Sequence, residues 1–261
     1  MNAPVDEKMF RLDGRIAVIT GAAGGICSAI ARAYANVGAR VACLDHDAAA
    51  AQALAAAIRE SGGDAIGLAC DVSDERSTID AAAQVREQLG RPAILVNGAA
   101  VLDHSGTILE IDPQEWQRVL SVNLTGAYLM SRAVLPAMIE AGGGSVIHIA
   151  SMHGSVGRAS RVSYTTAKAA LIMLAKNMAI DHADQGVRVN TLSPGAVATR
   201  RITFRYGDDA EAKLKEVAQK YLMKRFAHPD EMTGAALFLA SDASSYMTGS
   251  DLLVDGGYCA A

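Results

Sequence analysis

The sequence lacks several features that mark other classes of protein. Basic residues do not outnumber acidic ones, since Lys and Arg total 24 against 28 Asp and Glu, so we expect no broad cationic surface for nucleic acid. No apolar run reaches the roughly 20 residues that cross a bilayer, and the N-terminal stretch has no apolar signal core. These absences predict a cytoplasmic protein that binds neither nucleic acid nor a membrane.

The cysteines are few and do not form a recognisable metal site. Four are present, and none has the spacing of metal ligands, so we expect no bound metal and mainly reduced, structural thiols. They are Cys27, Cys43, Cys70 and Cys259.

Short apolar runs rich in β-branched residues alternate with longer helix-compatible stretches along the whole chain. This alternation predicts parallel strands joined by crossover helices, in a Rossmann-like, doubly wound α/β fold. With 261 residues and no linker or repeat, one domain over residues 1–261 is expected, and residues 197–224 resist assignment and suggest a substrate lid. The predicted strands are Ile16–Thr20, Arg40–Leu44, Ala65–Ala69, Ile94–Asn97, Ser145–Ile149, Arg188–Leu192 and Leu252–Val254.

A glycine-rich turn follows the first predicted strand and precedes a helical run. Gly21, Gly24, Gly25 and Ile26 occupy this turn. Glycines here allow the backbone to approach a pyrophosphate, whose charge the positive end of the helix stabilises. The context therefore indicates a dinucleotide site, where glycines alone would indicate a tight turn.

An aspartate follows the second predicted strand, where a dinucleotide fold places the adenosine ribose. The carboxylate of Asp45 can accept hydrogen bonds from the ribose hydroxyls and repel a 2′-phosphate. Asp45 thus favours NAD over NADP; its alternative role is that of an ordinary turn residue.

Proton transfer has one strong candidate pair. Tyr164 and Lys168 are four residues apart in a helix-compatible run, so they share a face, and the ammonium can stabilise a phenolate. A phenol so placed can exchange a proton with an alcohol or alkoxide. Ser151, just past the fifth predicted strand, can orient the substrate oxygen at the sheet edge where such folds bind ligands.

Taken together, these motifs resemble the short-chain dehydrogenase/reductase family over nearly the whole chain. The family's TGxxxGxG pattern is present except that Cys27 replaces the last glycine, and the segment from Asn97 to Ala100 stands in for its Asn-Asn-Ala-Gly. The resemblance implies adenine contacts from Asp71 and Val72. It further implies cofactor contacts from Asn97, Ala99, Pro194, Gly195, Val197 and Thr199, and from Tyr164 and Lys168.

The same resemblance implies a function and an assembly. It implies that Asn123 holds a water beside the lysine and so joins Ser151, Tyr164 and Lys168 in catalysis, and that the protein is a homotetramer. We expect NAD-dependent oxidation of a secondary alcohol or sugar hydroxyl. The alternatives are an NADP-dependent 3-oxoacyl-carrier-protein reductase and, from another class, a non-catalytic NAD-sensing or scaffold protein.

Arginines near the expected pocket raise the possibility of an anionic substrate. Two lie between Ser151 and Tyr164, and three follow the segment expected near the nicotinamide; in order they are Arg158, Arg161, Arg200, Arg201 and Arg205. Arginine presents a planar fork suited to a carboxylate, sulfonate or phosphate. Taken singly, each is more simply a solvated or ion-paired surface residue.

Overall fold

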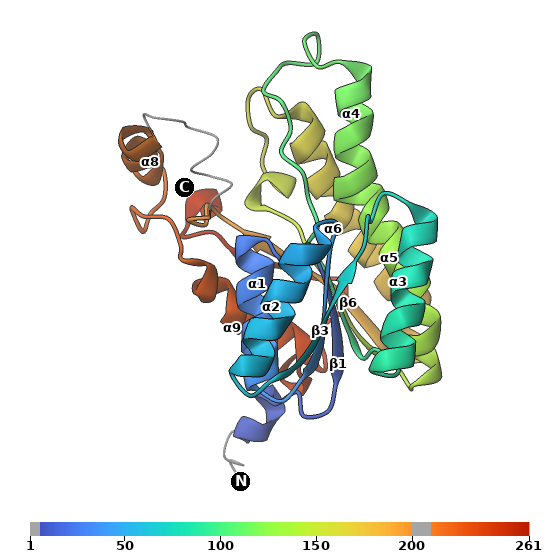
Figure 1. Cartoon of the computed structure of the whole chain (residues 1–261). Coiled ribbons are helices and arrows are strands. Elements are labelled where there is room, and N and C mark those ends of the chain that lie inside the picture. Colours follow the sequence, from blue (N-terminus) through green and yellow to red (C-terminus); the bar gives the residue numbers. More distant parts are fainter. Residues whose placement is uncertain (1–5, 200–209, 261) are drawn as a thin grey trace.

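The chain folds around one parallel sheet (Figure 1). The structure is a computed structural model and describes residues 6–199 and 210–260. Within this part of the chain the strand order is β3-β2-β1-β4-β5-β6-β7, with every neighbouring pair parallel. The strands are β1 Ile16–Thr20, β2 Arg40–Asp45, β3 Asp64–Ala69, β4 Ile94–Asn97, β5 Gly144–Ile149, β6 Val187–Pro194 and β7 Asp251–Val254. The predicted doubly wound fold is therefore confirmed.

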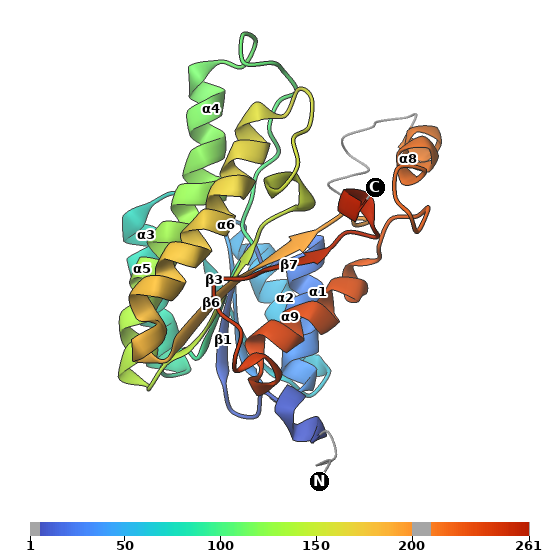
Figure 2. The same ribbon diagram turned by 180° about the vertical axis from the view of Figure 1, so that it is seen from behind.

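Helices cover both faces of the sheet (Figure 2). One apolar core lies between the sheet and α1, α2 and α9; a second lies between the sheet and α3, α5 and α6. The helices are α1 Gly25–Asn36, α2 Ala48–Glu60, α3 Glu75–Gln88, α4 Pro113–Leu120, α5 Gly126–Glu140, α6 Val162–His182, α8 Ala210–Ala218 and α9 Thr233–Ala240. The five strands between β3 and β7 are buried on both faces, which explains their near-continuous apolar runs in the sequence. None of the helices in the described ranges is both long and apolar enough to span a bilayer.

The helix that follows the glycine turn begins differently from its neighbours. Helices α2, α3 and α4 start at Asp47, Asp74 and Asp112, whose carboxylates accept hydrogen bonds from first-turn amides. Helix α1 starts at Gly24, which has no side chain to cap it. Its first amides therefore point toward the space above the sheet, where they can bind an anion.

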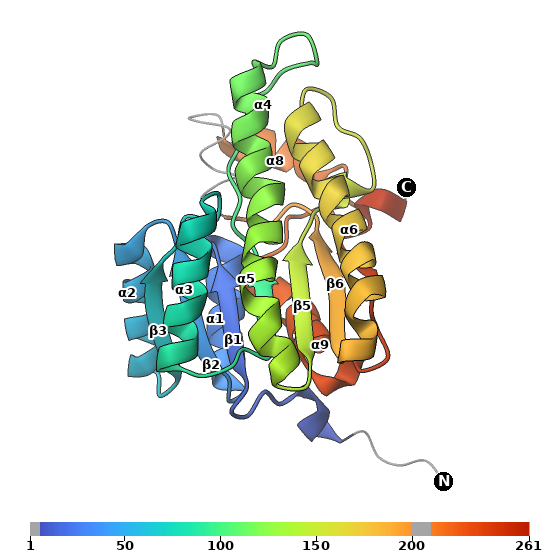
Figure 3. The ribbon, with the colours of Figure 1, turned by 90° about the vertical axis from the view of Figure 1, so that its right-hand side faces the viewer.

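Helices α4 and α5 form one long rod beside the sheet (Figure 3). They are joined by a turn of π-helix over Ser121–Thr125. A π turn inserts an extra residue into the helical ladder and is often found at functional sites. Here it brings Asn123 into the interior, with 1% of its surface exposed.

Candidate active site

A cavity of about 880 Å³ opens at the carboxyl edge of the sheet. Six strands contribute residues to its lining where they end: Gly21 after β1, Asp45 on β2, Cys70 after β3, Gly98 after β4, Ala150 after β5 and Pro194 on β6. The strand order reverses between β1 and β4, and open α/β sheets bind ligands at that point. The cavity therefore lies where the fold favours a dinucleotide.

Most of the residues that the sequence singles out line this cavity. They are Gly21, Gly24, Gly25, Ile26, Asp45, Asp71, Val72, Ala99, Ser151, Tyr164, Lys168, Pro194, Gly195, Val197 and Thr199. Two others, Asn97 and Asn123, are buried and are not part of the lining.

The glycine turn approaches the neighbouring strand closely. Gly21 has a φ of +64°, and a Cβ at this position would lie 2.7 Å from the backbone of Ala99. Both observations require glycine, because other residues rarely adopt this conformation and none would fit the gap. The close packing leaves the amides at the start of α1 facing the cavity, which suits a pyrophosphate.

The end of the cavity beside β2 and β3 is acidic. Asp45 is 6% exposed, and its two carboxylate oxygens accept hydrogen bonds from the amides of Ala23, at 3.0 Å, and Asp47, at 3.1 Å. A carboxylate has about four lone-pair positions, so capacity remains for ribose hydroxyls. Hydrogen bonds from the hydroxyl and amide of Ser73 hold the pKa of Asp71 below its usual range, which favours its charged form.

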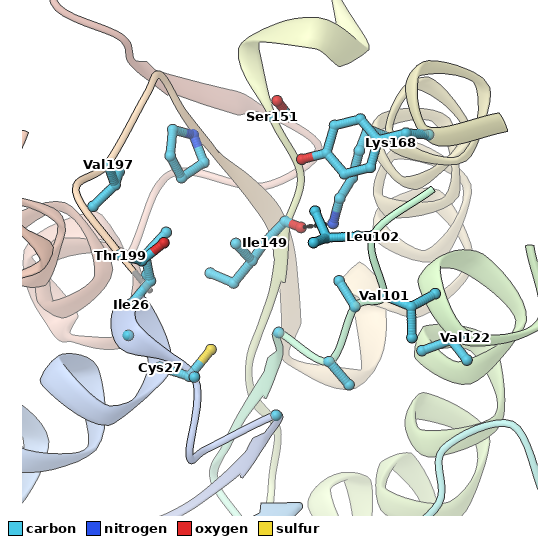
Figure 4. Close-up of a pocket in the computed structure, with 18 of the residues that line it drawn as sticks. Ile26, Cys27, Val101, Leu102, Val122, Ile149, Ser151, Lys168, Val197 and Thr199 are labelled. Carbon is cyan, nitrogen blue, oxygen red and sulfur yellow. Dashed lines mark hydrogen bonds between the residues drawn. The ribbon is translucent and has the colours of Figure 1, made fainter. Parts of the chain in front are cut away.

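At the opposite end, side chains from β5 and α6 gather around Lys168. Its Nζ donates a 2.6 Å hydrogen bond to the carbonyl oxygen of Ile149, at the end of β5, and lies 5.9 Å from the centre of the Tyr164 ring. Figure 4 shows the Lys168 ammonium pointing to Ile149, with Ser151 above it on the same strand exit. This arrangement keeps a cation buried beside the phenol.

A polar cluster lies beneath Lys168. Asn97 donates from Nδ2 to Ser131 Oγ, at 3.0 Å, and to Nδ1 of the fully buried His148, at 3.1 Å. Burial, followed by the charge of Lys168, lowers the pKa of His148 to about 3, so this ring is neutral. The side-chain amide of Asn97 thus joins the ends of β4 and β5 to α5, and its expected role in binding the cofactor stays a prediction.

Asn123 also has a structural contact. Its amide accepts from the backbone N–H of Val101, at 2.7 Å, and donates to the same residue's carbonyl oxygen, at 3.2 Å. The side chain thus fixes the loop that follows β4 along the cavity. A role in holding water beside the lysine would have to come from the backbone at the π turn and stays a prediction.

One of the candidate arginines is neutralised inside the protein. Arg161 forms a buried ion pair with Asp103, in which Nε donates to Oδ2 at 2.8 Å, and its guanidinium carbon lies 5.0 Å from the centre of the Tyr164 ring. An arginine so engaged holds the start of α6 against the loop after β4. The interpretation of Arg161 as a substrate-binding charge is therefore corrected. Arg200, Arg201 and Arg205 lie outside the described residues.

Several lining residues were not identified from the sequence. An apolar and aromatic wall is formed by Met152, Tyr221 and Phe226; Tyr221 and Phe226 pack edge to face with ring centres 5.9 Å apart. Tyr221 belongs to the predicted lid, and Val217 on α8 also lines the cavity. The sequence signal that could have identified Tyr221 was an aromatic residue within the unassigned segment 197–224. The expectation of a lid over residues 197–224 stays a prediction, since part of this segment is outside the described residues.

Comparisons with known proteins agree with this geometry. Residues 21–259 match a family model described as Enoyl-(Acyl carrier protein) reductase. D-threitol dehydrogenase of Mycolicibacterium smegmatis is 43% identical over 95% of this chain and 94% of its own length. Galactitol 2-dehydrogenase (L-tagatose-forming) of Cereibacter sphaeroides is 39% identical over 96% of this chain and 97% of its own. The crystal structure of a gluconate 5-dehydrogenase from Burkholderia cenocepacia, in complex with NADP and tartrate, is 33% identical with a TM-score of 0.92, covering 97% of this chain and 98% of the other.

The chain belongs to the short-chain dehydrogenase/reductase family. As a member of this family it is an oxidoreductase that uses a nicotinamide cofactor and acts on CH–OH groups. The residues at the cavity fit such a cofactor, because an uncapped helix start and a glycine turn face one end and a phenol beside a buried ammonium faces the other.

Two departures from the short-chain dehydrogenase/reductase motifs compensate for one another. Cys27, in place of the last motif glycine, is buried, and burial raises its pKa to about 12. A Cβ at Gly98 would overlap the Cys27 sulfur, so the thiol fills space that a side chain at position 98 would need. The first motif therefore has a side chain, Cys27, where the family usually has glycine. The second motif has glycine, Gly98, where the family usually has asparagine.

Proposed function

We propose that this chain is an NAD-dependent dehydrogenase that interconverts a secondary hydroxyl of a polyol or sugar and the corresponding carbonyl, with Tyr164 as the general acid and base. The observation that carries the proposal is the position of Tyr164 and Lys168 on α6, beside Ser151 and at one end of a dinucleotide-sized cavity. Similarity to dehydrogenases of threitol and galactitol supports the polyhydroxy class of substrate.

The chemistry divides between the cofactor and the side chains. When bound, NAD supplies the acceptor for the hydride that leaves the carbinol carbon. Tyr164 then takes the hydroxyl proton in oxidation and returns it in reduction. Ser151 donates a hydrogen bond to the substrate oxygen as charge changes there.

Lys168 makes proton removal favourable through its charge. The ammonium lies 5.9 Å from the centre of the Tyr164 ring and stabilises a phenolate over the neutral phenol. Its hydrogen bond to Ile149 fixes its direction relative to the end of β5. His148 below it is neutral and does not compete as a cation.

The choice of NAD is supported by the acidic end of the cavity. A ribose 2′-phosphate would lie against the carboxylate of Asp45, whose like charge opposes it. A similar solved structure contains NADP, so this choice is a proposal specific to the present sequence. The same carboxylate disfavours the alternative of an NADP-dependent 3-oxoacyl reductase.

The experiment is a panel of polyols, sugars and hydroxy acids with NAD, followed by NADH absorbance. Turnover excludes a non-catalytic sensor or scaffold, and Tyr164→Phe should lower it by about a hundredfold or more, the size of general acid–base catalysis. Tyr246→Phe, at a fully exposed tyrosine, is the control and should change nothing. NADH fluorescence should show that the Tyr164→Phe variant still binds cofactor; if it keeps more than about a tenth of the rate, another group carries the proton.

A homotetramer also remains part of the proposal. Apolar side chains are exposed on α6, at Met173 and Ile180, and on β7, at Leu253. Burial of such surfaces between subunits would remove them from water. Light scattering on the purified protein tests this, because a monomeric mass at micromolar concentration contradicts it.

A further inference from the structure

Charges along the cavity are segregated by sign. Among the described residues that line it, the carboxylates are Asp45, Asp47 and Asp71, all beside the ends of β2 and β3. The lysine and arginines that line it all come from the segment after β5 and from α6; they are Arg158, Arg161 and Lys168. The end of the cavity where the substrate reacts is therefore cationic.

The two arginines at this end have different partners. Arg161 is buried against Asp103, with 8% and 1% of the two side chains exposed, so its charge is cancelled within the protein. Arg158 is exposed, and its Nη1 lies 3.2 Å from Nε2 of His153. No carboxylate pairs with Arg158 in residues 6–199 and 210–260.

His153 positions Arg158 without neutralising it. A guanidinium has only donors, so Nε2 of the imidazole accepts and the ring carries its proton on Nδ1. Burial, followed by the charges of Arg158 and Arg161, lowers the pKa of His153 to about 4, which keeps the ring neutral at physiological pH. The ring is held in turn by an edge contact with Tyr258, with ring centres 5.7 Å apart.

Arg158 is held in one orientation and keeps its positive charge, and both properties favour the binding of an anion. A carboxylate partner would orient the guanidinium equally well but would cancel the charge, as Asp103 does for Arg161. The remaining donors of the planar fork suit a carboxylate, and a single uncancelled charge matches a monoanion.

We propose that Arg158 binds the carboxylate of the substrate, which is therefore a polyhydroxy acid whose reacting hydroxyl lies at Ser151 and Tyr164. His153 is a positioning residue for this contact. The inference rests on the proposed function, because it assigns the substrate class of the same site. It separates Arg158 from Arg161, which the sequence presents as equivalent.

The test compares matched neutral and acidic substrates. Threitol with threonate, and galactitol with galactonate, are assayed with NAD at pH 7.5. The wild-type protein should favour the acid in each pair. Arg158→Gln should lower kcat/KM for the acid about tenfold to a hundredfold, mainly through KM, the size of a hydrogen bond to a charged group. The loss for the polyol should be at least several times smaller, and Arg158→Lys should recover part of the preference.

A matched control is available on the surface. Arg132, an exposed arginine on α5 paired with Glu75, does not line the cavity, and Arg132→Gln should leave the ratio of acid to polyol unchanged. His153→Phe should reduce the preference for the acid less than Arg158→Gln does, because it removes orientation and leaves the charge.

Binding measured without turnover separates this inference from the proposed function. Calorimetry of threonate and galactonate with the NADH-loaded protein should show binding that Arg158→Gln weakens at least about tenfold. If no substrate reduces NAD but this binding and its loss are seen, the proposed function fails and Arg158 stands as an anion site. Equal losses for acid and polyol, or acid binding that Arg158→Gln leaves intact, would overturn the assignment.

Discussion

The two ends of the cavity are built in different ways. At the nucleotide end the groups come from one short turn and the end of the neighbouring strand: a glycine with positive φ, an uncapped helix start, and Asp45, which accepts hydrogen bonds from the amides of Ala23 and Asp47. At the catalytic end the side chains are fixed by partners far away in the sequence, such as Arg161 by Asp103 and His148 by Asn97. The first end is therefore specified by a short motif, and the second by the folded core.

This contrast predicts that the catalytic end is the more sensitive to loss of a single partner. Asp103→Ala leaves the Arg161 guanidinium buried without a counter-charge and should lower the free energy of unfolding by about 3 to 5 kcal/mol. Urea denaturation measures it. The matched control is Asp13→Ala, which breaks an exposed pair with Arg11 and should cost less than about 1 kcal/mol. Similar losses in the two variants would mean that burial of the Asp103 pair is unimportant.

The second largest effect concerns catalysis. Lys168→Met removes the buried ammonium beside Tyr164, and kcat should fall about a hundredfold because the phenolate loses its stabilising charge. Steady-state rates with NAD and a good polyol substrate measure it. Lys176→Met, at an exposed lysine two turns further along α6, is the control. Retention of most of the rate in Lys168→Met would assign the charge to another group.

Sequence patterns predicted the fold because its signals are local. Each strand is a short apolar run, and the seven runs found by composition correspond to β1 to β7 with ends shifted by at most two residues. Tyr164 and Lys168 were placed on one helix by their spacing within a helix-compatible run. Local spacing also located the glycine turn and Asp45.

The parts that sequence did not predict depend on where side chains point. Asn97 and Asn123 lie at the expected places, yet their amides bond to Ser131 and His148 and to Val101, below and beside the cavity. Nothing in the sequence connects Arg161 to Asp103, which precedes it by 58 residues. The direction of a buried polar side chain is set by the whole core, so local patterns cannot give it.

Buried neutral histidines at the catalytic end predict that the stability of the folded protein depends on pH. The pKa of His148 is lowered to about 3 in the folded protein, whereas an unfolded chain binds the proton near pH 6.5. The unfolded state therefore binds more protons below pH 6.5, and stability falls as the pH decreases from 6.5 toward 3. Between pH 7 and pH 5 this one group should cost about 2 kcal/mol.

Urea titrations at pH 7, 6 and 5 measure this loss, in a range where carboxylates remain ionised. His148→Gln should remove the share of this group and leave that of His153, whose pKa is lowered to about 4, so the dependence should become shallower even if stability at pH 7 is lower. His104→Gln, at an exposed histidine, is the control for the loss of an imidazole. The same slope in wild-type protein and His148→Gln would contradict the assignment.

A further prediction concerns the contact between Cys27 and Gly98. Gly98→Asn should place a side chain against the Cys27 sulfur and destabilise the protein by about 1 to 3 kcal/mol, as overpacking does. Adding Cys27→Gly should recover part of this loss, and Cys27→Gly alone should bind NAD no worse than wild type. Thermal unfolding and calorimetry give the two readings. If the change in unfolding free energy of the double variant equals the sum of the changes in the two single variants, the two positions are independent.

The central claim is that the protein is an NAD-dependent alcohol dehydrogenase, in which Asp45 selects the cofactor and Tyr164 transfers the proton. The most direct measurement is kcat/KM for NAD and for NADP with one polyol or sugar-acid substrate, in wild-type protein and in Asp45→Ser. The account predicts that wild type favours NAD by about tenfold or more, and that Asp45→Ser narrows this ratio by relieving repulsion of the 2′-phosphate. A wild-type preference for NADP, or a ratio that Asp45→Ser leaves unchanged, would contradict it.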